Sequence, residues 1–318
     1  MFSITEIEEA YARIKPYIIE TPLLRMPTLD PYLGCEVYLK AENMQITGAF
    51  KLRGALNRAL SLSSEARSNG LVCASSGNHG RGITYAAKML GTKATVVMPY
   101  TAPEVKVLAI KALGAKVVQC ETSCRFDVAE QICNQQGATL IPPYDDEFVM
   151  AGQGTAGLEI AKQCPEIDAV IVPVSGGGLI SGVSIALKEI LPAVKVYGAE
   201  PAALPRYTMS LQAGKPIQVP YQQTLADALV SQKPGSTCFP YVQKYVDQVV
   251  PVSDTFLLKG MKLLLTEGKV LAEPSGCIGI AAVLQGQLSF QRKEKVCFLI
   301  SGGSVGISQL ALLETLAF

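Results

Sequence analysis

The stretch AVIVPVSGGGLISGVSIAL, residues 169–187, is the part of this chain most informative about its fold class. It begins with an apolar, β-branched run of strand length, passes through a loop of serine and glycine, and ends in apolar residues at helical spacing. Pro173 and three consecutive glycines interrupt the apolar run. We therefore expect a buried strand, a tight loop and a helix here, and no transmembrane segment.

The same order of apolar run, turn and helix-period segment recurs along the chain. We predict strands at residues 36–40, 71–74, 94–98, 116–119, 169–174, 195–199, 248–252 and 296–300, and helices at 79–90, 103–113, 125–136 and 179–190. This alternation predicts an α/β protein whose parallel sheets are covered by helices. Segment 200–235 contains several prolines and has weak periodicity, so we expect it to be irregular and to wrap the surface.

Composition narrows the possible partners and compartment. The chain has 28 Lys and Arg against 27 Asp and Glu, and a net charge of +1 offers no basic field for nucleic acid or an anionic membrane. Residues 1–10 lack the basic-then-apolar order of an export signal, so we expect a cytoplasmic protein. The nine cysteines are expected to be reduced and mostly in the core, and Cys120 and Cys124 lack evident partners for a zinc site.

Three loops of small polar residues follow predicted strands: Ser75-Ser76-Gly77-Asn78-His79, Ser175-Gly176-Gly177-Gly178 and Ser301-Gly302-Gly303-Ser304. Carboxyl ends of parallel strands line one crevice, and a helix N-terminus there offers free amides to an anion. We expect the three loops to form one composite ligand site. His79, the single histidine, is expected to pack or hydrogen-bond at a helix start.

Lys51 lies in TGAFKLRGA, residues 47–55, at a probable helix start. Desolvation and the helix dipole would lower the pKa of its amine, and a neutral amine is what Schiff-base formation needs. On composition alone a solvated surface lysine is the commoner case. The Ser175–Gly178 loop could likewise be a tight turn, but it lacks the spacing of dinucleotide and Walker motifs, which argues against NAD and ATP.

Taken in chain order, these motifs resemble the fold type II pyridoxal 5′-phosphate (PLP) enzymes, the tryptophan synthase β-like fold, and within it the threonine and serine dehydratase and serine racemase family. The resemblance covers nearly the whole chain. It is carried by residues 49–55, 75–79, 142–146, 151–155, 175–178, 224–227, 273–276 and 301–303.

This resemblance implies a role for each matched residue. Lys51 would bind the cofactor covalently and later remove the substrate α-proton, with Phe50 near the ring, Asn78 on the ring hydroxyl and Ser301 on the pyridine nitrogen. The phosphate would be cradled by Ser175, Gly176, Gly177, Gly178 and Leu179. The substrate carboxylate would be received by Ser75, Ser76, Gly77, Asn78 and His79.

The resemblance also implies the organisation of the molecule. A large PLP-binding domain would comprise residues 1–59 and 148–318, and a small inserted α/β domain residues 60–147. The cofactor would lie in the cleft between them, and the small domain would close over the substrate. The family further implies a homodimer.

The implied activity is elimination from a β-hydroxy amino acid such as L-threonine or L-serine, which yields a 2-oxo acid and ammonia. A serine at position 301, rather than an aspartate, makes the ring a weaker electron sink and transamination less favourable. Racemisation is the main alternative, with Lys51 and Ser76 as the two bases. A second alternative is dehydration of a modified hydroxy amino acid, as in hydroxyectoine breakdown.

Several positions depart from the family pattern. Arg206 stands where racemase-like relatives have an aspartate that, with Glu200, binds a divalent metal, so Glu200 is only a possible ligand. We expect Arg206 to be a solvated surface residue, or else to pair with Glu200 or reach a second substrate carboxylate. Arg81 replaces a frequent glutamine, and Ser304 replaces an asparagine. A non-catalytic binding or regulatory protein and a nucleotide-binding domain are the rival classes, and the intact catalytic set argues against both.

Overall fold

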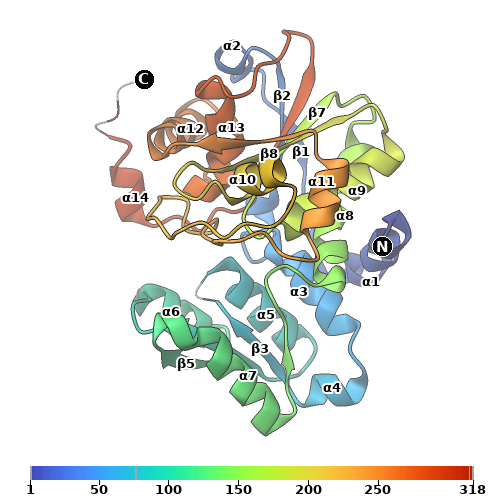
Figure 1. Ribbon diagram of the computed structural model, residues 1–318, viewed down its shortest axis with the longest axis vertical. Helices are drawn as coiled ribbons and strands as arrows, with labels where there is room; N and C mark the ends of the chain where they lie inside the picture. Colours follow the sequence, from blue (N-terminus) through green and yellow to red (C-terminus); the bar gives the residue numbers. More distant parts are fainter. Residues whose placement is uncertain (1, 76, 103, 315, 317–318) are drawn as a thin grey trace.

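The computed structural model describes residues 2–75, 77–102, 104–314 and 316 (Figure 1). The strands are β1 (Leu23–Arg25), β2 (Glu36–Lys40), β3 (Leu71–Ala74), β4 (Ala94–Pro99), β5 (Lys116–Cys120), β6 (Thr139–Leu140), β7 (Ala169–Pro173), β8 (Lys195–Pro201), β9 (Gln248–Val252) and β10 (Lys295–Leu299). The α-helices are α1 (Ile4–Ile14), α2 (Asp30–Leu33), α3 (Lys51–Leu60), α4 (Ser64–Ser68), α5 (Asn78–Met89), α6 (Glu104–Ala112), α7 (Arg125–Gln136), α8 (Glu147–Gln163), α9 (Gly178–Ile190), α10 (Arg206–Ala213), α11 (Phe239–Tyr245), α12 (Asp254–Thr266), α13 (Ile278–Leu284) and α14 (Ile307–Ala311). Short 3-10 helices are η1 (Lys15–Tyr17), η2 (Glu42–Met44), η3 (Thr122–Cys124) and η4 (Pro274–Cys277).

The strands form two sheets. The larger has the order β1-β2-β10-β7-β8-β9, and the smaller has the order β5-β4-β3-β6. Neighbouring strands are parallel except β1 and β2 at one edge of the larger sheet. The predicted α/β class is confirmed, and each predicted strand is present within two residues. The structure adds β1 and β6, which are too short to show a period.

The larger sheet is buried on both faces, which explains its continuous apolar strands. In β7, Ala169 and Ile171 face one hydrophobic core, which is shared with α12 and α13. Val170 and Val172 face a second core, which is shared with α8 and α9. Strands covered on both faces lose the polar alternation of half-exposed strands. We call this sheet with its covering helices the large lobe.

The smaller sheet is covered in the same way. Leu71 and Cys73 of β3 pack with residues of α3, α5 and α6, whereas Val72 and Ala74 pack against the α7 side. We call this sheet with its covering helices the small lobe, and Figure 1 shows it below the large lobe, with α3 between them. The predicted domain boundaries near residues 60 and 147 stay a prediction.

One expectation about local structure was partly wrong. Segment 200–235 contains α10, a regular helix of eight residues. Pro205 immediately precedes that helix, at a place where proline does not interrupt intrahelical hydrogen bonds. Pro205 thus marks a helix start, while most of the segment after α10 has little regular structure.

Among the described residues, no helix combines the length and the hydrophobicity needed to cross a membrane. The cysteines are free thiols and most are buried, as expected for small apolar side chains. Cys124 is exposed and Cys133 is partly exposed. The predicted homodimer stays a prediction.

Candidate active site

The segment before Lys51 is fixed to the loop that follows β10. The Phe50 amide donates to the Ser301 carbonyl at 3.1 Å, and the Gly303 amide donates to the Gly48 carbonyl at 2.9 Å. These bonds close an isolated antiparallel bridge between the two segments. Two parts of the predicted site that are far apart in sequence are thereby brought together, with Lys51 as the first residue of α3.

The Lys51 amine lies in a poorly hydrated position. Its Nζ donates to the Pro143 carbonyl at 2.6 Å and lies 5.0 Å from the centre of the Phe50 ring. Among the described residues no carboxylate forms an ion pair with it. Desolvation lowers the pKa of Lys51 to about 8. A substantial fraction of the amine is therefore neutral near physiological pH, the form that attacks a carbonyl.

The Ser175–Gly178 loop presents unpaired backbone donors at the start of α9. Gly177 has a φ of +106°, which favours glycine, and a Cβ there would lie 1.9 Å from the Tyr207 hydroxyl. The amides of Gly176 and Gly177 donate to no other described residue. Free amides at a helix N-terminus attract an anion such as phosphate.

Segment 143–145 lies between Lys51 and this loop. The Tyr144 ring occupies the space where a Cβ on Gly176 would lie, at 2.3 Å. Asp145 has a positive φ of 62°, and its carboxylate accepts the Thr237 amide at 2.6 Å. Sequence pattern alone predicts no role for these residues, although residues 142–146 are part of the family resemblance. The positive φ and the carboxylate contact are visible only in the folded chain.

Asn78 lies at the start of α5 and takes part in a directed chain of hydrogen bonds. Arg81 Nη1 donates to Ser304 Oγ at 3.0 Å, and Ser304 Oγ lies 2.8 Å from Asn78 Oδ1. Arginine can only donate, so the Ser304 hydroxyl accepts from Arg81 and gives its own hydrogen to Asn78. Asn78 Nδ2 in turn donates to Glu273 Oε1 at 2.8 Å and keeps one N–H for another acceptor.

Glu273 is a site residue that the sequence analysis did not single out. Its side chain is 3% exposed. Burial, followed by the nearby negative charge of Asp227, raises the pKa of Glu273 to about 7. Its motif, Glu273-Pro274-Ser275-Gly276, belongs to the resemblance, and a carboxylate within an otherwise apolar segment was the signal available.

His79 is held as a neutral side chain. Its Nε2 lies 2.9 Å from the Ile141 carbonyl, and burial, followed by the charge of Lys51, lowers the pKa of His79 to about 3. Nε2 must therefore carry the hydrogen, which leaves Nδ1 as an acceptor without a partner among the described residues. In this tautomer its side chain has no free donor for a substrate carboxylate, so a contribution there would come from its backbone amide.

The hydroxyls of Ser301 and Ser75 differ in whether they already form a hydrogen bond. The Ser301 carbonyl is fixed by Phe50, while its hydroxyl makes no hydrogen bond with another described residue and is free for a ligand. Ser75 Oγ accepts the Gly77 amide at 3.3 Å. Ser76 lies outside the described residues, so its predicted roles as second base and substrate ligand stay predictions.

The expectation that Arg206 is a surface residue was wrong. Its side chain is completely buried, and its Nε lies 3.9 Å from Glu200 Oε2, so the alternative pairing with Glu200 is the one present. Glu200 also accepts the amides of Tyr207 at 2.9 Å and Thr208 at 2.7 Å. Both of its oxygens are thus engaged. The part of the chain that the structure describes contains no group of three His, Cys, Asp or Glu side chains placed to hold a metal.

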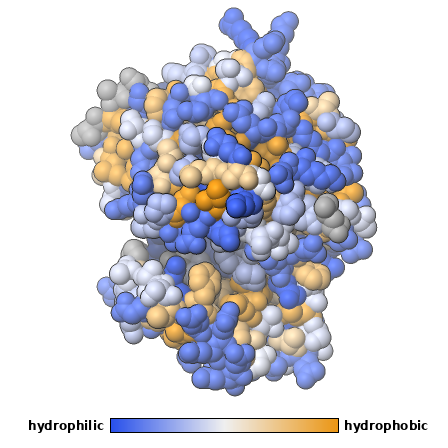
Figure 2. All heavy atoms as spheres, viewed as in Figure 1, coloured by the Kyte–Doolittle hydropathy of each residue, from blue (hydrophilic) through white to orange (hydrophobic). Residues whose placement is uncertain are grey.

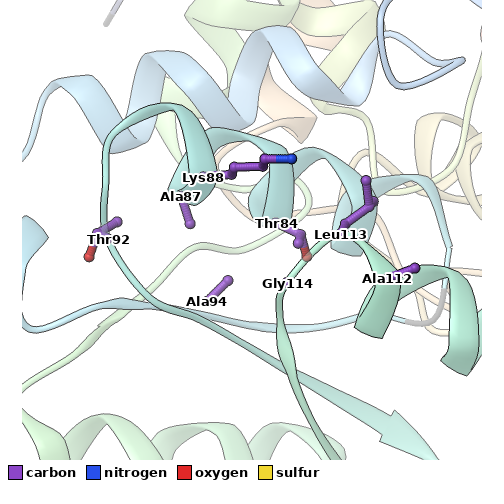
Figure 3. A pocket seen from close by; sticks show the side chains of 8 residues that line it. All are labelled: Thr84, Ala87, Lys88, Thr92, Ala94, Ala112, Leu113 and Gly114. Carbon is purple, nitrogen blue, oxygen red and sulfur yellow. The ribbon is translucent and has the colours of Figure 1, made fainter.

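A hollow of about 350 Å³ lies elsewhere, on the small lobe between α5, β4 and the end of α6 (Figure 3). Its lining is formed by Thr84, Ala87, Lys88, Thr92, Ala94, Ala112, Leu113 and Gly114. None of the predicted site residues lines it. The candidate site instead lies where the lobes meet, as the contacts of Asn78 with Glu273 and of Arg81 with Ser304 show, and Figure 2 shows a recess between the lobes.

The candidate-site residues where the two lobes meet fit pyridoxal phosphate. A desolvated lysine without a carboxylate partner suits its aldehyde, and free amides at the glycine loop suit its phosphate. The free hydroxyl of Ser301 suits the ring nitrogen, and the remaining N–H of Asn78 suits the ring hydroxyl. These contacts come from both lobes.

Comparison with known proteins agrees with this chemistry. The chain is 41% identical over 313 residues to an L-threonine ammonia-lyase of Thermotoga maritima, covering 98% of this chain and 77% of that protein. It is also 41% identical over 313 residues to a serine racemase of Arabidopsis thaliana, covering 96% and 94%. The crystal structure of a threonine deaminase from T.th. matches with a TM-score of 0.91 and 40% identity, covering 96% and 99%. Residues 14–302 match the family described as "Pyridoxal-phosphate dependent enzyme", and the chain belongs to this family, among its threonine and serine ammonia-lyase and serine racemase members.

Proposed function

We propose that this chain is an ammonia-lyase that converts a small β-hydroxy amino acid, such as L-threonine or L-serine, to a 2-oxo acid and ammonia. The observation that carries the proposal is the Lys51 amine, desolvated, free of a carboxylate partner and placed beside the Ser301 loop. Relatives with ammonia-lyase names over nearly the whole chain support it.

Different residues would transfer the proton, bind the cofactor and orient the substrate. When bound, pyridoxal phosphate supplies an electron-withdrawing ring that makes the α-hydrogen of the attached amino acid acidic. Lys51, with a pKa of about 8, holds and releases a proton at Nζ under neutral conditions. Free amides of the Ser175–Gly178 loop bind the phosphate, and amides at the start of α5 orient the substrate carboxylate.

The substrate loses its α-hydrogen as a proton, which Lys51 accepts, and its β-hydroxyl, which leaves as water. The proton taken up by the hydroxyl balances the one removed from the α-carbon, so Lys51 ends each turnover in its starting protonation state. The enamine product rearranges to an imine in solution. One water then hydrolyses that imine to the 2-oxo acid and ammonia, so no external oxidant or reductant is needed.

Racemisation is the second candidate, and one observation favours keeping it. The Arabidopsis serine racemase and the Thermotoga ammonia-lyase are equally identical to this chain, at 41%. Racemisation would need a proton donor on the face opposite Lys51, and Ser76 is the predicted residue.

The test is incubation of the purified, PLP-loaded protein with a panel of L- and D-hydroxy amino acids, with assays of 2-oxo acid, ammonia and the enantiomer of the residual substrate. Lys51→Ala should abolish turnover, whereas Lys162→Ala, which removes an exposed lysine of α8, should retain it. Oxo acid and ammonia that depend on Lys51 would support the lyase. Appearance of the opposite enantiomer without oxo acid would identify a racemase, and Lys51-independent turnover would contradict both.

A further inference from the structure

We propose that two buried neighbours at the start of α10, Arg206 and Tyr207, are positioning residues that aim the amides of the Ser175–Gly178 loop at the cofactor phosphate. The inference rests on the proposed function, because it concerns how the loop holds that phosphate. Neither residue has a place in the set of site residues derived from the sequence.

Arg206 clamps the end of β7 and the first residue of the loop. Its side chain is completely buried, and Nε donates to the Ser175 carbonyl at 3.1 Å, while Nη2 donates to the Val174 carbonyl at 2.5 Å. Nη1 donates to the Leu204 carbonyl at 2.8 Å. A guanidinium holds its donors in a rigid plane, so contacts to successive carbonyls fix the backbone at this point.

Tyr207 clamps the next residue of the loop. Its hydroxyl donates to the Gly176 carbonyl at 2.9 Å, beside the Gly235 amide, which donates to the same carbonyl at 2.9 Å, and its side chain is also completely buried. Burial raises the pKa of Tyr207 well above its usual range, so the hydroxyl keeps its hydrogen and remains a donor. A Cβ on Gly177 would lie 1.9 Å from this hydroxyl, which shows how closely the ring supports the loop.

The two clamps orient the amides through the geometry of the peptide bond. In a trans peptide the carbonyl of one residue and the N–H of the next point in opposite directions. Fixing the Ser175 carbonyl toward Arg206 therefore turns the Gly176 N–H away from α10, and fixing the Gly176 carbonyl toward Tyr207 does the same for Gly177. These are the two amides that donate to no other described residue. They are free to converge on an anion on the opposite side of the loop.

Glu200 fixes the start of α10 relative to β8. Its carboxylate accepts the amides of Tyr207 and Thr208 and faces Arg206. Glu200 lies in β8, the strand beside β7, so strand, helix and loop form one rigid unit. The loop is thereby ordered when the protein folds. Binding of the phosphate then does not carry the entropic cost of ordering its donors.

Binding of PLP and of pyridoxal is compared in order to distinguish an effect on phosphate binding from a loss of stability. PLP and pyridoxal share the ring and the aldehyde, but pyridoxal lacks the phosphate. In apo protein, Tyr207→Phe should weaken PLP binding by roughly 5-fold or more, the value of one well-placed hydrogen bond. The same substitution should leave the pyridoxal Kd within about twofold, since no phosphate contact is lost.

A charge-balanced variant tests the arginine. Glu200→Gln with Arg206→Met removes the buried ion pair without leaving one charge unpaired. The ratio of the pyridoxal Kd to the PLP Kd should fall further than in Tyr207→Phe, because Ser175 and Val174 both lose their donor. Should this double variant not fold, Tyr207→Phe is sufficient to decide the proposal.

Tyr241→Phe is the matched control. Tyr241 is also a buried tyrosine whose hydroxyl accepts the Phe2 amide at 2.7 Å, but it does not contact the loop. Tyr241→Phe should leave the ratio of the two Kd values unchanged. Equal weakening of both ligands by Tyr207→Phe, or no weakening, would overturn the clamp. Failure of the wild-type protein to bind PLP would instead overturn the proposed function.

Discussion

At the scale of single residues, Glu273 shows how burial changes the chemistry of a side chain. Its carboxyl is buried beside Asn78, and its pKa is raised from 4.5 to about 7 by burial, followed by the charge of Asp227. Near neutral pH it therefore exchanges between a protonated and an ionised form. Because it bonds the side chain predicted to hold the cofactor hydroxyl, its protonation is coupled to that part of the site.

The raised pKa predicts a pH-dependent effect of Glu273→Gln on stability. Between pH 4.5 and about 7 the folded protein binds more protons at this residue than the unfolded chain. Its contribution to stability is present below pH 4.5 and is lost as the pH rises through 7. Relative to wild type, the variant should gain up to about 3 kcal/mol over this interval. Urea unfolding of both apo proteins across this range measures it, and parallel pH profiles would contradict it.

Arg81 and Ser304, two departures from the family pattern, contact each other and orient Asn78. Ser304→Ala removes the donor that sets the direction of the Asn78 amide. We expect PLP affinity to fall by about 1 kcal/mol, or roughly 5-fold, with a shift in the visible absorption of the loaded protein. Ser308→Ala, at an exposed serine in α14, is the control. Unchanged affinity and spectrum in Ser304→Ala would show that Asn78 is oriented by Glu273 alone.

At the scale of elements, α3 is anchored by a buried network of charges that lies two residues beyond Lys51. Arg53 forms ion pairs with Glu42 at 2.8 Å and with Glu159 at 2.7 Å, and Lys40 pairs with Glu159 at 2.6 Å. All four side chains are completely buried. The network joins β2, η2, α3 and α8, and so fixes the start of α3 relative to the large lobe.

Glu159→Gln should destabilise the protein strongly, because the buried network would keep two positive charges, Lys40 and Arg53, against one carboxylate, Glu42. We expect a loss of about 3–5 kcal/mol in the free energy of unfolding. Glu166→Gln is the matched control, since Glu166 also pairs with a lysine, Lys295, but is largely exposed, and should cost less than about 1 kcal/mol. Chemical unfolding of both variants checks the difference, and equal losses would argue against a structural role for the network.

In the Ser175–Gly178 loop, the space around Gly177 leaves no room for a larger side chain. Gly177→Ala places a methyl group at a φ of +106° and 1.9 Å from the Tyr207 hydroxyl. Gly214→Ala at the end of α10 has a φ of +68° but meets nothing within 4 Å. Gly214→Ala should therefore cost only backbone strain, about 1–2 kcal/mol, and Gly177→Ala should cost more and weaken PLP binding. Thermal unfolding and PLP titration of both variants test this, and equal effects would exclude crowding as the cause.

At the scale of the whole molecule, the two sheets have separate cores, which meet around α3, where Val149 of α8 packs into the core of the small lobe. Leu71 and Leu52 belong to the core of the small lobe, and Val296 and Phe298 to one core of the large lobe. Between the lobes, Asn78 bonds Glu273, and Lys106 pairs with Asp227 at 3.0 Å on a partly exposed surface. The latter contact is worth little by itself.

This organisation predicts that the cofactor couples the unfolding of the two lobes. Apo protein should unfold in two calorimetric transitions, one for each core. The residues proposed to bind PLP belong to both lobes, so saturation should merge the transitions and raise the stability, by about 2.7 kcal/mol at a free ligand concentration of about 100 times Kd. Differential scanning calorimetry with and without PLP measures this. One sharp transition in the apo protein would show that α3 already makes the lobes a single cooperative unit.

The sequence by itself determined the fold class, eight of the ten strands that the structure describes, and the content of the three loops. Strands such as residues 169–174 and 296–300 can be recognised as apolar runs in the sequence because both faces of a central parallel strand are buried. Lys51 and the three loops could be selected because the chemistry they offer depends on residue type and on position after a strand or at a helix start, whereas the individual roles of Asn78 and Ser301 are implied by the resemblance. Their roles remain proposals.

Only the tertiary structure decided which of these loops and charges meet. Arg206, expected at the surface, is buried because the fold places Glu200 of β8 and the carbonyls of Val174 and Ser175, which follow β7, around it. Glu273 contacts Asn78 across 195 residues of sequence. Periodicity reports which face of an element is covered, but it carries no information about the distant segment that covers it. Burial, hydrogen-bond partners and shifted pKa values are consequences of that long-range packing.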